Sequence, residues 1–196
     1  MSRQVFLYDP PDRFVAGTVG LPGRRTFFLQ ATDGSRTTSV ALEKAQVEAL
    51  AERVDELLDE VVRRSGGKTA VPAVAPSDIA DTDPLRTPVD EEFRVGTMAL
   101  AWDGDAERLV VEAQALVELE ADSDEEFAEA EERLLRDDEN GPPMLRVLLS
   151  GGMARAFAKR ALDVVNAGRP PCPLCNLPLD PEGHVCPRQN GYRRRL

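Results

Sequence analysis

One pattern of residues occurs twice in this chain, and it constrains the fold more than any other feature of the sequence. Residues 13–21 align with residues 92–100, so that Phe-x-x-Gly-Thr-x-x-Leu recurs in both halves. Further along, residues 40–53 align with residues 147–160. Such internal similarity is typical of a duplicated structural unit, although amphipathic strand–helix segments also align by chance. Because the order of the matches is shared, we predict two tandem repeats that pack as a pseudo-dimer.

The residues between these matches indicate strands followed by a helix in each half. Runs of β-branched and aromatic residues, separated by Pro, Gly and Asp-Gly turn signals, predict strands over residues 4–8, 13–19, 26–31 and 37–42. Apolar residues at helical spacing from Val47 to Val61 then predict an amphipathic helix over about residues 43–64. The second half predicts strands over 93–102, 108–119 and 144–149, an acidic helix over about 124–136, and a helix over 150–167 with Ser150 as its N-cap.

These elements predict an α+β protein of two tandem strand–strand–strand–helix repeats with a C-terminal zinc knuckle. The first repeat covers residues 1–67, and residues 68–91 form a proline-rich linker or loop. The second repeat covers residues 92–167 and contains an acidic helical insertion at 120–143. A zinc-binding tail, residues 168–196, completes the chain.

The tail contains all three cysteines of the chain, Cys172, Cys175 and Cys186, and its only histidine, His184. Three thiolates and one imidazole are a usual ligand set for structural zinc. In a zinc knuckle, the amides two and three residues after the first cysteine donate to its sulfur, so Pro173 removes only an amide that is not needed. We therefore predict one structural Zn²⁺ held by these four side chains.

Three alternatives to this ligand set are open at the level of sequence. His184 and Cys186 are separated by one residue, which demands a tight bend if both bind the metal, so His184 is alternatively a neighbour of the site while a carboxylate or water is the fourth ligand. Cys172 and Cys175 also match the spacing of a thioredoxin-like redox pair, but such a pair normally begins a helix after a strand, and proline-rich turns follow here. The third alternative is that the cysteines have no role.

The tail sequence resembles a known family. Gly-Arg-Pro-Pro-Cys-Pro-x-Cys-x-x-Pro-Leu-Asp-Pro-x-Gly-His-x-Cys-Pro-Arg-x-Asn-Gly-Tyr, residues 168–192, together with a repeat-bearing body, is similar to an actinobacterial family described as a domain of unknown function. The resemblance covers nearly the whole chain. It implies a cytoplasmic actinobacterial protein, and it carries over no catalytic residues.

Charge and composition narrow the classes of partner. The chain has a net charge of −11, and the tail is itself basic, so the body is still more acidic. A body of this charge repels phosphate backbones at long range. The first residues lack the apolar run of a secretory signal, and no apolar run approaches the ~18 residues of a membrane span. We expect a cytoplasmic protein without membrane contact.

With its single histidine assigned to zinc, the chain offers no Ser-His or Cys-His catalytic pair. We therefore expect a non-catalytic, zinc-containing binding or adaptor protein whose partner is another protein. A strand-rich repeat used twice also resembles the single-strand nucleic-acid-binding folds of the PUR and Whirly type, which gives a second hypothesis. Its contact residues would be Arg13, Arg24, Arg25, Phe27 and Arg36. An enzyme with an unidentified site is the third hypothesis.

Overall fold

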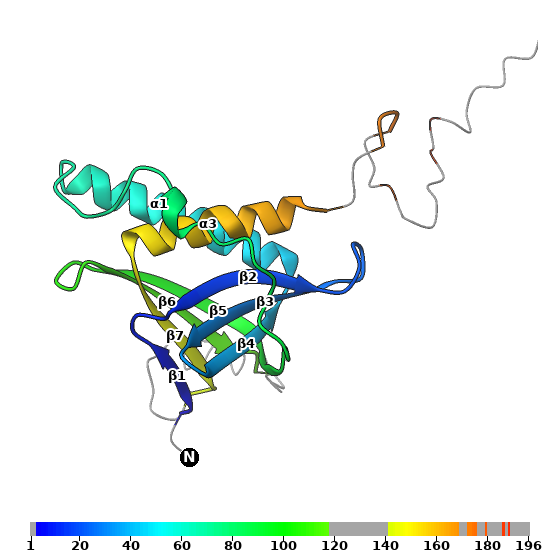
Figure 1. Cartoon of the computed structure of the whole chain (residues 1–196), viewed down its shortest axis with the longest axis horizontal. Helices are drawn as coiled ribbons and strands as arrows, with labels where there is room; N and C mark the ends of the chain where they lie inside the picture. The colour runs from blue at the N-terminus through cyan, green and yellow to red at the C-terminus, as the bar shows by residue number, and fades with distance from the viewer. Residues whose placement is uncertain are drawn as a thin grey trace, which may run out of the picture.

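Strands from both halves of the chain join in a single sheet. The computed structural model describes residues 3–117, 141–168, 172–175, 179, 186 and 188. Its seven strands lie in the order β1-β7-β6-β5-β4-β3-β2, and two long helices lie side by side across one face of the curved sheet (Figure 1). The protein is therefore of the mixed α+β class, as predicted.

The order of elements along the chain has the form expected of two units. β2 (Arg13–Val19), β3 (Thr26–Asp33) and β4 (Arg36–Leu42) are antiparallel and lead into α1 (Lys44–Arg64). β5 (Glu91–Asp103), β6 (Arg108–Ala115) and β7 (Met144–Ser150) are likewise antiparallel and lead into α3 (Gly151–Asn166). The two sets meet where β4 pairs in parallel with β5, and β1 (Val5–Tyr8) adds in parallel to β7. Descent from a duplication stays a prediction.

Two details of the second half bear on the sequence prediction. β6 ends at Ala115, short of the strand predicted over residues 108–119, although the Leu116 amide still donates to the Arg94 carbonyl of β5 at 2.7 Å. The acidic helix predicted over residues 124–136 lies outside the described residues.

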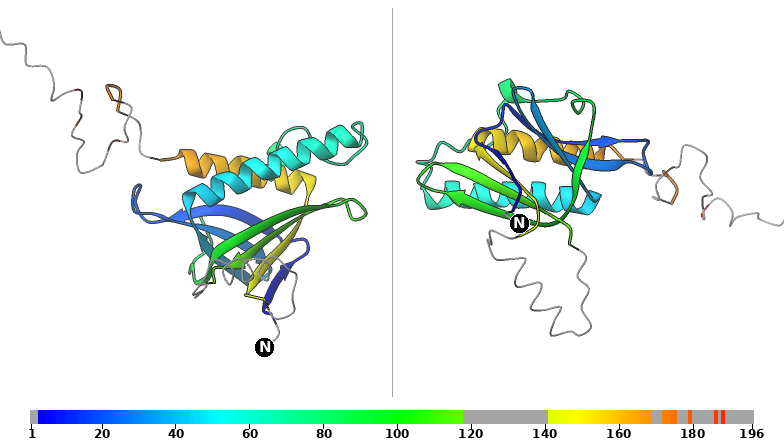
Figure 2. Two further views of the ribbon diagram at one scale, coloured as in Figure 1. Left: turned by 180° about the vertical axis from the view of Figure 1, so that it is seen from behind. Right: turned by 90° about the horizontal axis from the view of Figure 1, so that it is seen from below.

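The sheet curls so that its first strand approaches the opposite half (Figure 2). The Tyr8 hydroxyl on β1 donates to Thr38 Oγ1 on β4 at 2.8 Å, and the Arg36 guanidinium donates to the Leu7 carbonyl at 2.7 Å while lying over the Tyr8 ring. Residues of all seven strands therefore surround one core.

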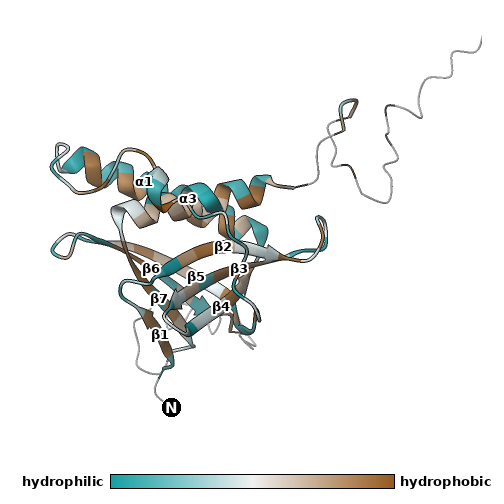
Figure 3. Cartoon of the chain, viewed as in Figure 1, coloured by the Kyte–Doolittle hydropathy of each residue, from teal (hydrophilic) through white to brown (hydrophobic). Residues whose placement is uncertain are grey.

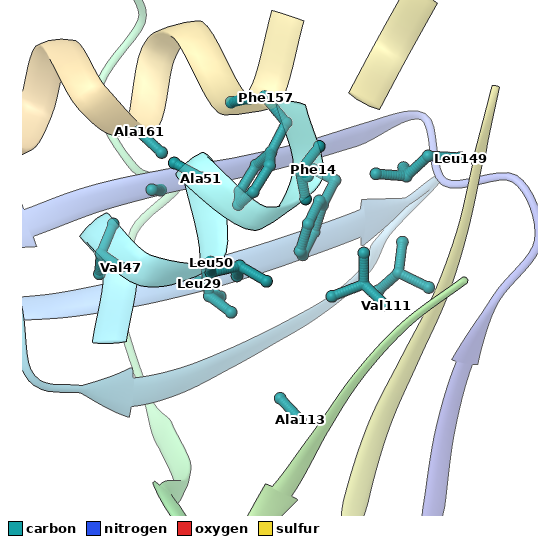
Figure 4. Close-up of a cluster of buried hydrophobic side chains, with 14 of the residues drawn as sticks. Phe14, Leu29, Val47, Leu50, Ala51, Val111, Ala113, Leu149, Phe157 and Ala161 are labelled. Atoms are coloured by element: carbon teal, nitrogen blue, oxygen red, sulfur yellow. The ribbon is translucent and has the colours of Figure 1, made fainter. Parts of the chain in front are cut away.

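Both helices bury their apolar stripes in that core (Figure 4). Leu50 of α1 and Phe157 of α3 are each 2 % exposed, and Phe157 stacks on Phe14 of β2 with ring centroids 4.6 Å apart. Side chains start the helices: the Glu43 amide donates to Gln46 Oε1 at 2.8 Å, and Ser150 Oγ accepts from the Met153 amide at 3.3 Å. Ser150 is thus the N-cap that the sequence predicted.

The proline-rich segment after α1 packs against the body, and we call residues 69–90 the strap. It contains a short 3₁₀ turn, η1 (Ser77–Ile79). Leu85 of the strap, with Val89, covers Val15 and Phe28 on the face of the sheet opposite the helices. The Gln30 side chain donates to the Arg86 carbonyl at 3.0 Å and accepts from the Arg86 amide at 2.7 Å.

The glycines of the repeated Phe-x-x-Gly-Thr motif occupy positions of close approach. A Cβ at Gly17 would lie 2.6 Å from the Leu85 side chain, and a Cβ at Gly96 would lie 2.8 Å from the Leu116 Cα. Gly96 also lies at an irregularity in the β5–β6 pairing. Glycine in a strand often marks a bulge or a segment of backbone that passes close by, and here a leucine lies against each of the two motif glycines.

No helix in the described part of the chain is both long enough and apolar enough to span a membrane.

We predict that Leu50→Ala and Phe157→Ala each lower the free energy of unfolding by about 2–5 kcal/mol, because each leaves a cavity in the shared core. Urea titration measures this. Val74→Ala, at a position that is 75 % exposed, is the control and should change stability by less than ~0.5 kcal/mol. A change that small at both Leu50 and Phe157 would show that these helix faces are not buried.

The two motif glycines give a second, paired prediction. Gly17→Ala should destabilise the protein, and adding Leu85→Ala should recover part of the loss, because the clash is with a side chain. Gly96→Ala should also destabilise it, but Leu116→Ala should not compensate, because that clash is with backbone. The prediction is wrong if the leucine substitution recovers the same amount of stability in both double variants, or recovers none in either.

Candidate metal centre

The three cysteines of the tail come together beyond the end of α3. One ligand atom from each of Cys172, Cys175 and Cys186 lies within 4.8 Å of the others, and Cys172 Sγ is 3.9 Å from Cys186 Sγ. Cys172 and Cys186 are 5 % and 3 % exposed. Residues that lie far apart in the tail sequence therefore form one sheltered cluster of sulfurs.

The spacing of the sulfurs excludes a disulfide and is compatible with a metal ion. A disulfide places its sulfurs about 2.05 Å apart. Tetrahedral zinc with Zn–S bonds of about 2.3 Å places two sulfur ligands about 3.8 Å apart. The 3.9 Å between Cys172 and Cys186 fits the metal, and all three thiols are free.

The backbone around Cys172 favours its thiolate form. The amides of Cys175 and Leu174 donate to the Cys172 sulfur and, with weaker contributions from the thiols of Cys175 and Cys186, lower its pKa to about 6 against the opposing effect of desolvation. These are the amides two and three residues after the first cysteine, as the knuckle interpretation expected. A thiolate is the form of cysteine that binds metal ions, so the lowered pKa is compatible with a metal ligand at Cys172.

Arg188 links the two parts of the tail that carry the cysteines. Arg188 donates from Nη1 to the Leu174 carbonyl at 2.8 Å, which ties the chain just after Cys186 to the turn between Cys172 and Cys175. His184, the predicted fourth ligand, lies outside the described residues. Among the described residues, the cysteines are the only cluster of three or more His, Cys, Asp or Glu side chains with metal-ligand spacing.

The five residues of the nucleic-acid hypothesis have separate environments. Phe27 is 5 % exposed and faces the core, so its ring is not open to a base. Arg13 is bound to Asp81 in the strap, and Arg36 lies over Tyr8. Arg24 and Arg25 belong to the β2–β3 turn, where Arg25 donates to the carbonyls of Ala167 and Val164 at the end of α3.

Sequence reasoning missed a charged cluster between the strap and α3. The Asp81 carboxylate forms ion pairs with Arg13 Nε and Arg160 Nη1, each at 2.5 Å. Arg160 Nε donates to the Ala16 carbonyl on β2 at 3.0 Å. These three charged residues line a cavity of about 260 Å³ whose apolar walls include Phe14 and Phe157. Asp81 lies in a proline-rich segment without periodicity, so no pattern in the sequence pointed to it.

A second cluster joins the two helices. Arg155 of α3 is 6 % exposed and donates to Asp55 and Asp59 of α1, and its Nε reaches the Pro72 carbonyl in the strap at 3.2 Å. Burial opposes the charge of Arg155, but its partners keep the pKa above the usual arginine value. In both clusters the arginines donate to carboxylates and backbone carbonyls of the same chain, which is typical of structural ion pairs.

Comparison with known proteins gives one family. The family model with the description "Protein of unknown function (DUF3090)" matches residues 6–186, a span that runs from β1 to Cys186 and so includes the cysteine cluster. No curated protein and no solved structure matches the chain. The resemblance to an uncharacterised domain family is confirmed, while an actinobacterial origin stays a prediction.

We predict a pH-dependent role for Asp81. The hydrogen bond from Arg13, reinforced by the charges of Arg13 and Arg160 and opposed by burial, holds the pKa of Asp81 below its usual value. A lowered pKa in the folded state stabilises the fold above the unfolded pKa, near 4, and this stabilisation is lost as the pH falls through the lowered value. Asp81→Asn should therefore cost about 1–2 kcal/mol at pH 7 and progressively less below about pH 4.

Urea titration of wild type and Asp81→Asn across this pH range provides the measurement. Asp83→Asn is the matched control, because its exposed carboxylate receives no hydrogen bond from the described residues. A stability difference for Asp81→Asn that stays constant between pH 7 and pH 3 would contradict the assigned ion pair.

Proposed function

We propose that this chain, which belongs to the DUF3090 family, is a zinc-containing protein without catalytic activity that acts by binding another protein. The observation that supports the metal is the cluster of three thiols with a 3.9 Å sulfur–sulfur distance. The protein-binding role is inferred from the structural character of that site and from the charge of the chain.

The proposed metal site holds one Zn²⁺ through Cys172, Cys175, Cys186 and His184. Zinc supplies no redox chemistry and, with three sulfurs and one nitrogen, has no open position for water or substrate. Its role is then to fold the tail: the amides of Leu174 and Cys175 stabilise one thiolate, and Arg188 closes the turn. A site of reduced thiols also fits a reducing compartment, so we place the protein in the cytoplasm.

A metal site beyond the end of α3 would hold the tail in one conformation, so that the tail could form a binding surface for another protein. Leu174, in the turn between the first two cysteines, is 50 % exposed, so the turn carries an apolar side chain toward solvent. Fixing the tail before binding lowers the conformational entropy that is lost on association. A tail held rigid in this way, with Leu174 exposed, would bind a partner protein at a lower entropic cost than a flexible tail.

A nucleic-acid partner receives less support. Stacking on single-stranded bases requires accessible aromatic rings, and Phe27 is buried. The net charge of −11 also opposes approach of a phosphate backbone. No described feature favours this second function over protein binding.

We further propose that the body arose by duplication of a three-strand, one-helix unit. Support comes from the repeated element order and from the two motif glycines, which admit a leucine-bearing segment at matching positions of β2 and β5. The two units share one core, so we interpret them as halves of a pseudo-dimer.

The metal is tested by elemental analysis of protein purified without chelators, for which we predict about one zinc per chain. Cys175→Ser should lose the zinc and make the tail sensitive to protease, while the urea midpoint of the body stays unchanged, because the site organises the tail alone. Leu174→Ala is the matched control in the same turn and should retain the metal. His184→Ala should weaken retention if His184 is the fourth ligand.

Wild-type protein without metal, or a Cys175→Ser variant that keeps a full equivalent of zinc, would contradict the proposed site. Loss of zinc from His184→Ala no greater than from Leu174→Ala would assign the fourth ligand elsewhere.

A further inference from the structure

The end of the body from which the tail departs carries a group of cations that form no ion pair with any described carboxylate. A cleft of about 360 Å³ lies there, lined by Gly23, Arg25 and Phe27 from the β2–β3 region, Lys44 at the start of α1, and the last residues of α3 and its C-terminus. Figure 1 shows the β2–β3 turn and the end of α3 at this same end of the molecule. Arg24, which is exposed, lies between two residues that belong to the cleft and its rim, Gly23 and Arg25.

At this end of the body, cations without an ion pair among the described residues lie close together. Several arginines elsewhere pair with carboxylates, as Arg13 and Arg160 do with Asp81 and Arg155 does with Asp55. Arg86, by contrast, donates to the Gly34 carbonyl and has no ion pair within the described residues. Within the described residues, Arg24 and Lys44 have no ion pair. Arg25 donates only to the carbonyls of Val164 and Ala167 and lies 4.9 Å from the centroid of the Phe27 ring. In a chain of net charge −11, Arg25 and Lys44 in the lining of the cleft and Arg24 beside it form a local basic site.

The same turn exposes apolar side chains. Leu21 is 75 % exposed and Val19 is 48 % exposed, and the turn is held by a hydrogen bond from the Arg24 amide to the Leu21 carbonyl at 2.9 Å. Coloured by hydropathy, the turn shows both hydrophobic and hydrophilic residues (Figure 3). An exposed leucine beside arginines on a fixed turn combines apolar contact with charge recognition, as protein-binding surfaces do.

We propose that this surface, which we call the turn patch and define as Leu21, Arg24, Arg25 and Lys44, binds an acidic segment of a partner protein. The inference rests on the proposed protein-binding function and names the chemistry of the partner. Carboxylates of the partner would pair with the three cations, and an apolar side chain would cover Leu21. Charge complementarity of this kind gives specificity and speeds association.

An acidic peptide fits the turn patch better than a nucleic acid does. A phosphate backbone carries closely spaced negative charges that extend beyond a small patch and meet the acidic body. A peptide segment can confine its charges to the patch, and it offers an apolar side chain for Leu21. The only aromatic side chain in the lining, Phe27, is buried beneath Arg25 and cannot stack on a base.

The experiment uses the full-length zinc-loaded protein and a fluorescein-labelled 16-residue peptide of glutamate and leucine, followed by fluorescence polarisation at low and physiological salt. The matching peptide with glutamine in place of glutamate reports the charge dependence. We expect Arg24→Glu and Lys44→Glu each to weaken binding of the glutamate peptide about three- to tenfold, and Leu21→Ser to weaken it at both salt concentrations. Lys68→Glu reverses another exposed lysine outside the cleft and should leave binding within about twofold of wild type.

Four outcomes would overturn the proposal. The first is that the glutamate peptide does not bind at low salt, and the second is that Lys68→Glu weakens peptide binding as much as Arg24→Glu does. The third is that a 16-residue oligo(dT) binds more tightly than the glutamate peptide. The fourth is that the peptide binds only after residues 122–136 are deleted, which would identify the chain's own acidic segment as the occupant of the turn patch. Because the turn patch belongs to the body, Cys175→Ser should keep peptide binding even where zinc is lost. Failure of the metal site and failure of the turn patch are therefore distinguished.

Discussion

The structure is held together by burial of the apolar face of one curved sheet. The seven strands cannot bury that face by themselves, so α1 and α3 lie across it, and residues such as Phe14, Leu50 and Phe157 form one core from both halves of the chain. The opposite face of β2–β4 is closed by the strap, which Arg13 and Arg160 hold through Asp81. Each half of the chain therefore relies on the other for its burial.

The elements of this fold could be predicted from sequence because their signals are local. The spacing of apolar residues indicated α1, and Ser150 marked the start of α3. The parallel junction of β4 with β5 could not be predicted, since it depends on how two distant units meet. The packing of the strap could not be predicted either, since it depends on tertiary contacts. Leu85 is buried against Gly17, and Asp81 pairs with Arg13 and Arg160, which come from distant elements.

For the candidate site, residue types and spacing predicted which cysteines meet, because thiolate ligands cluster in short turn-forming segments. The structure adds the amides that stabilise Cys172 and the Arg188 contact that closes the turn. The turn patch could not be predicted in the same way. Nothing in the sequence separates Arg24 and Arg25 from Arg13 and Arg36. The fold does so, because Arg13 pairs with Asp81 and Arg36 lies over Tyr8, whereas Arg24 and Arg25 belong to the turn that exposes Leu21.

The proposed zinc coordination is the central claim, and X-ray absorption at the zinc edge of the purified full-length protein tests it most directly. We predict that the zinc is bound by three sulfurs at about 2.3 Å and one imidazole nitrogen at about 2.0–2.1 Å, from Cys172, Cys175, Cys186 and His184. A shell made only of oxygen and nitrogen, or a shell with fewer than three sulfurs per zinc, would contradict it.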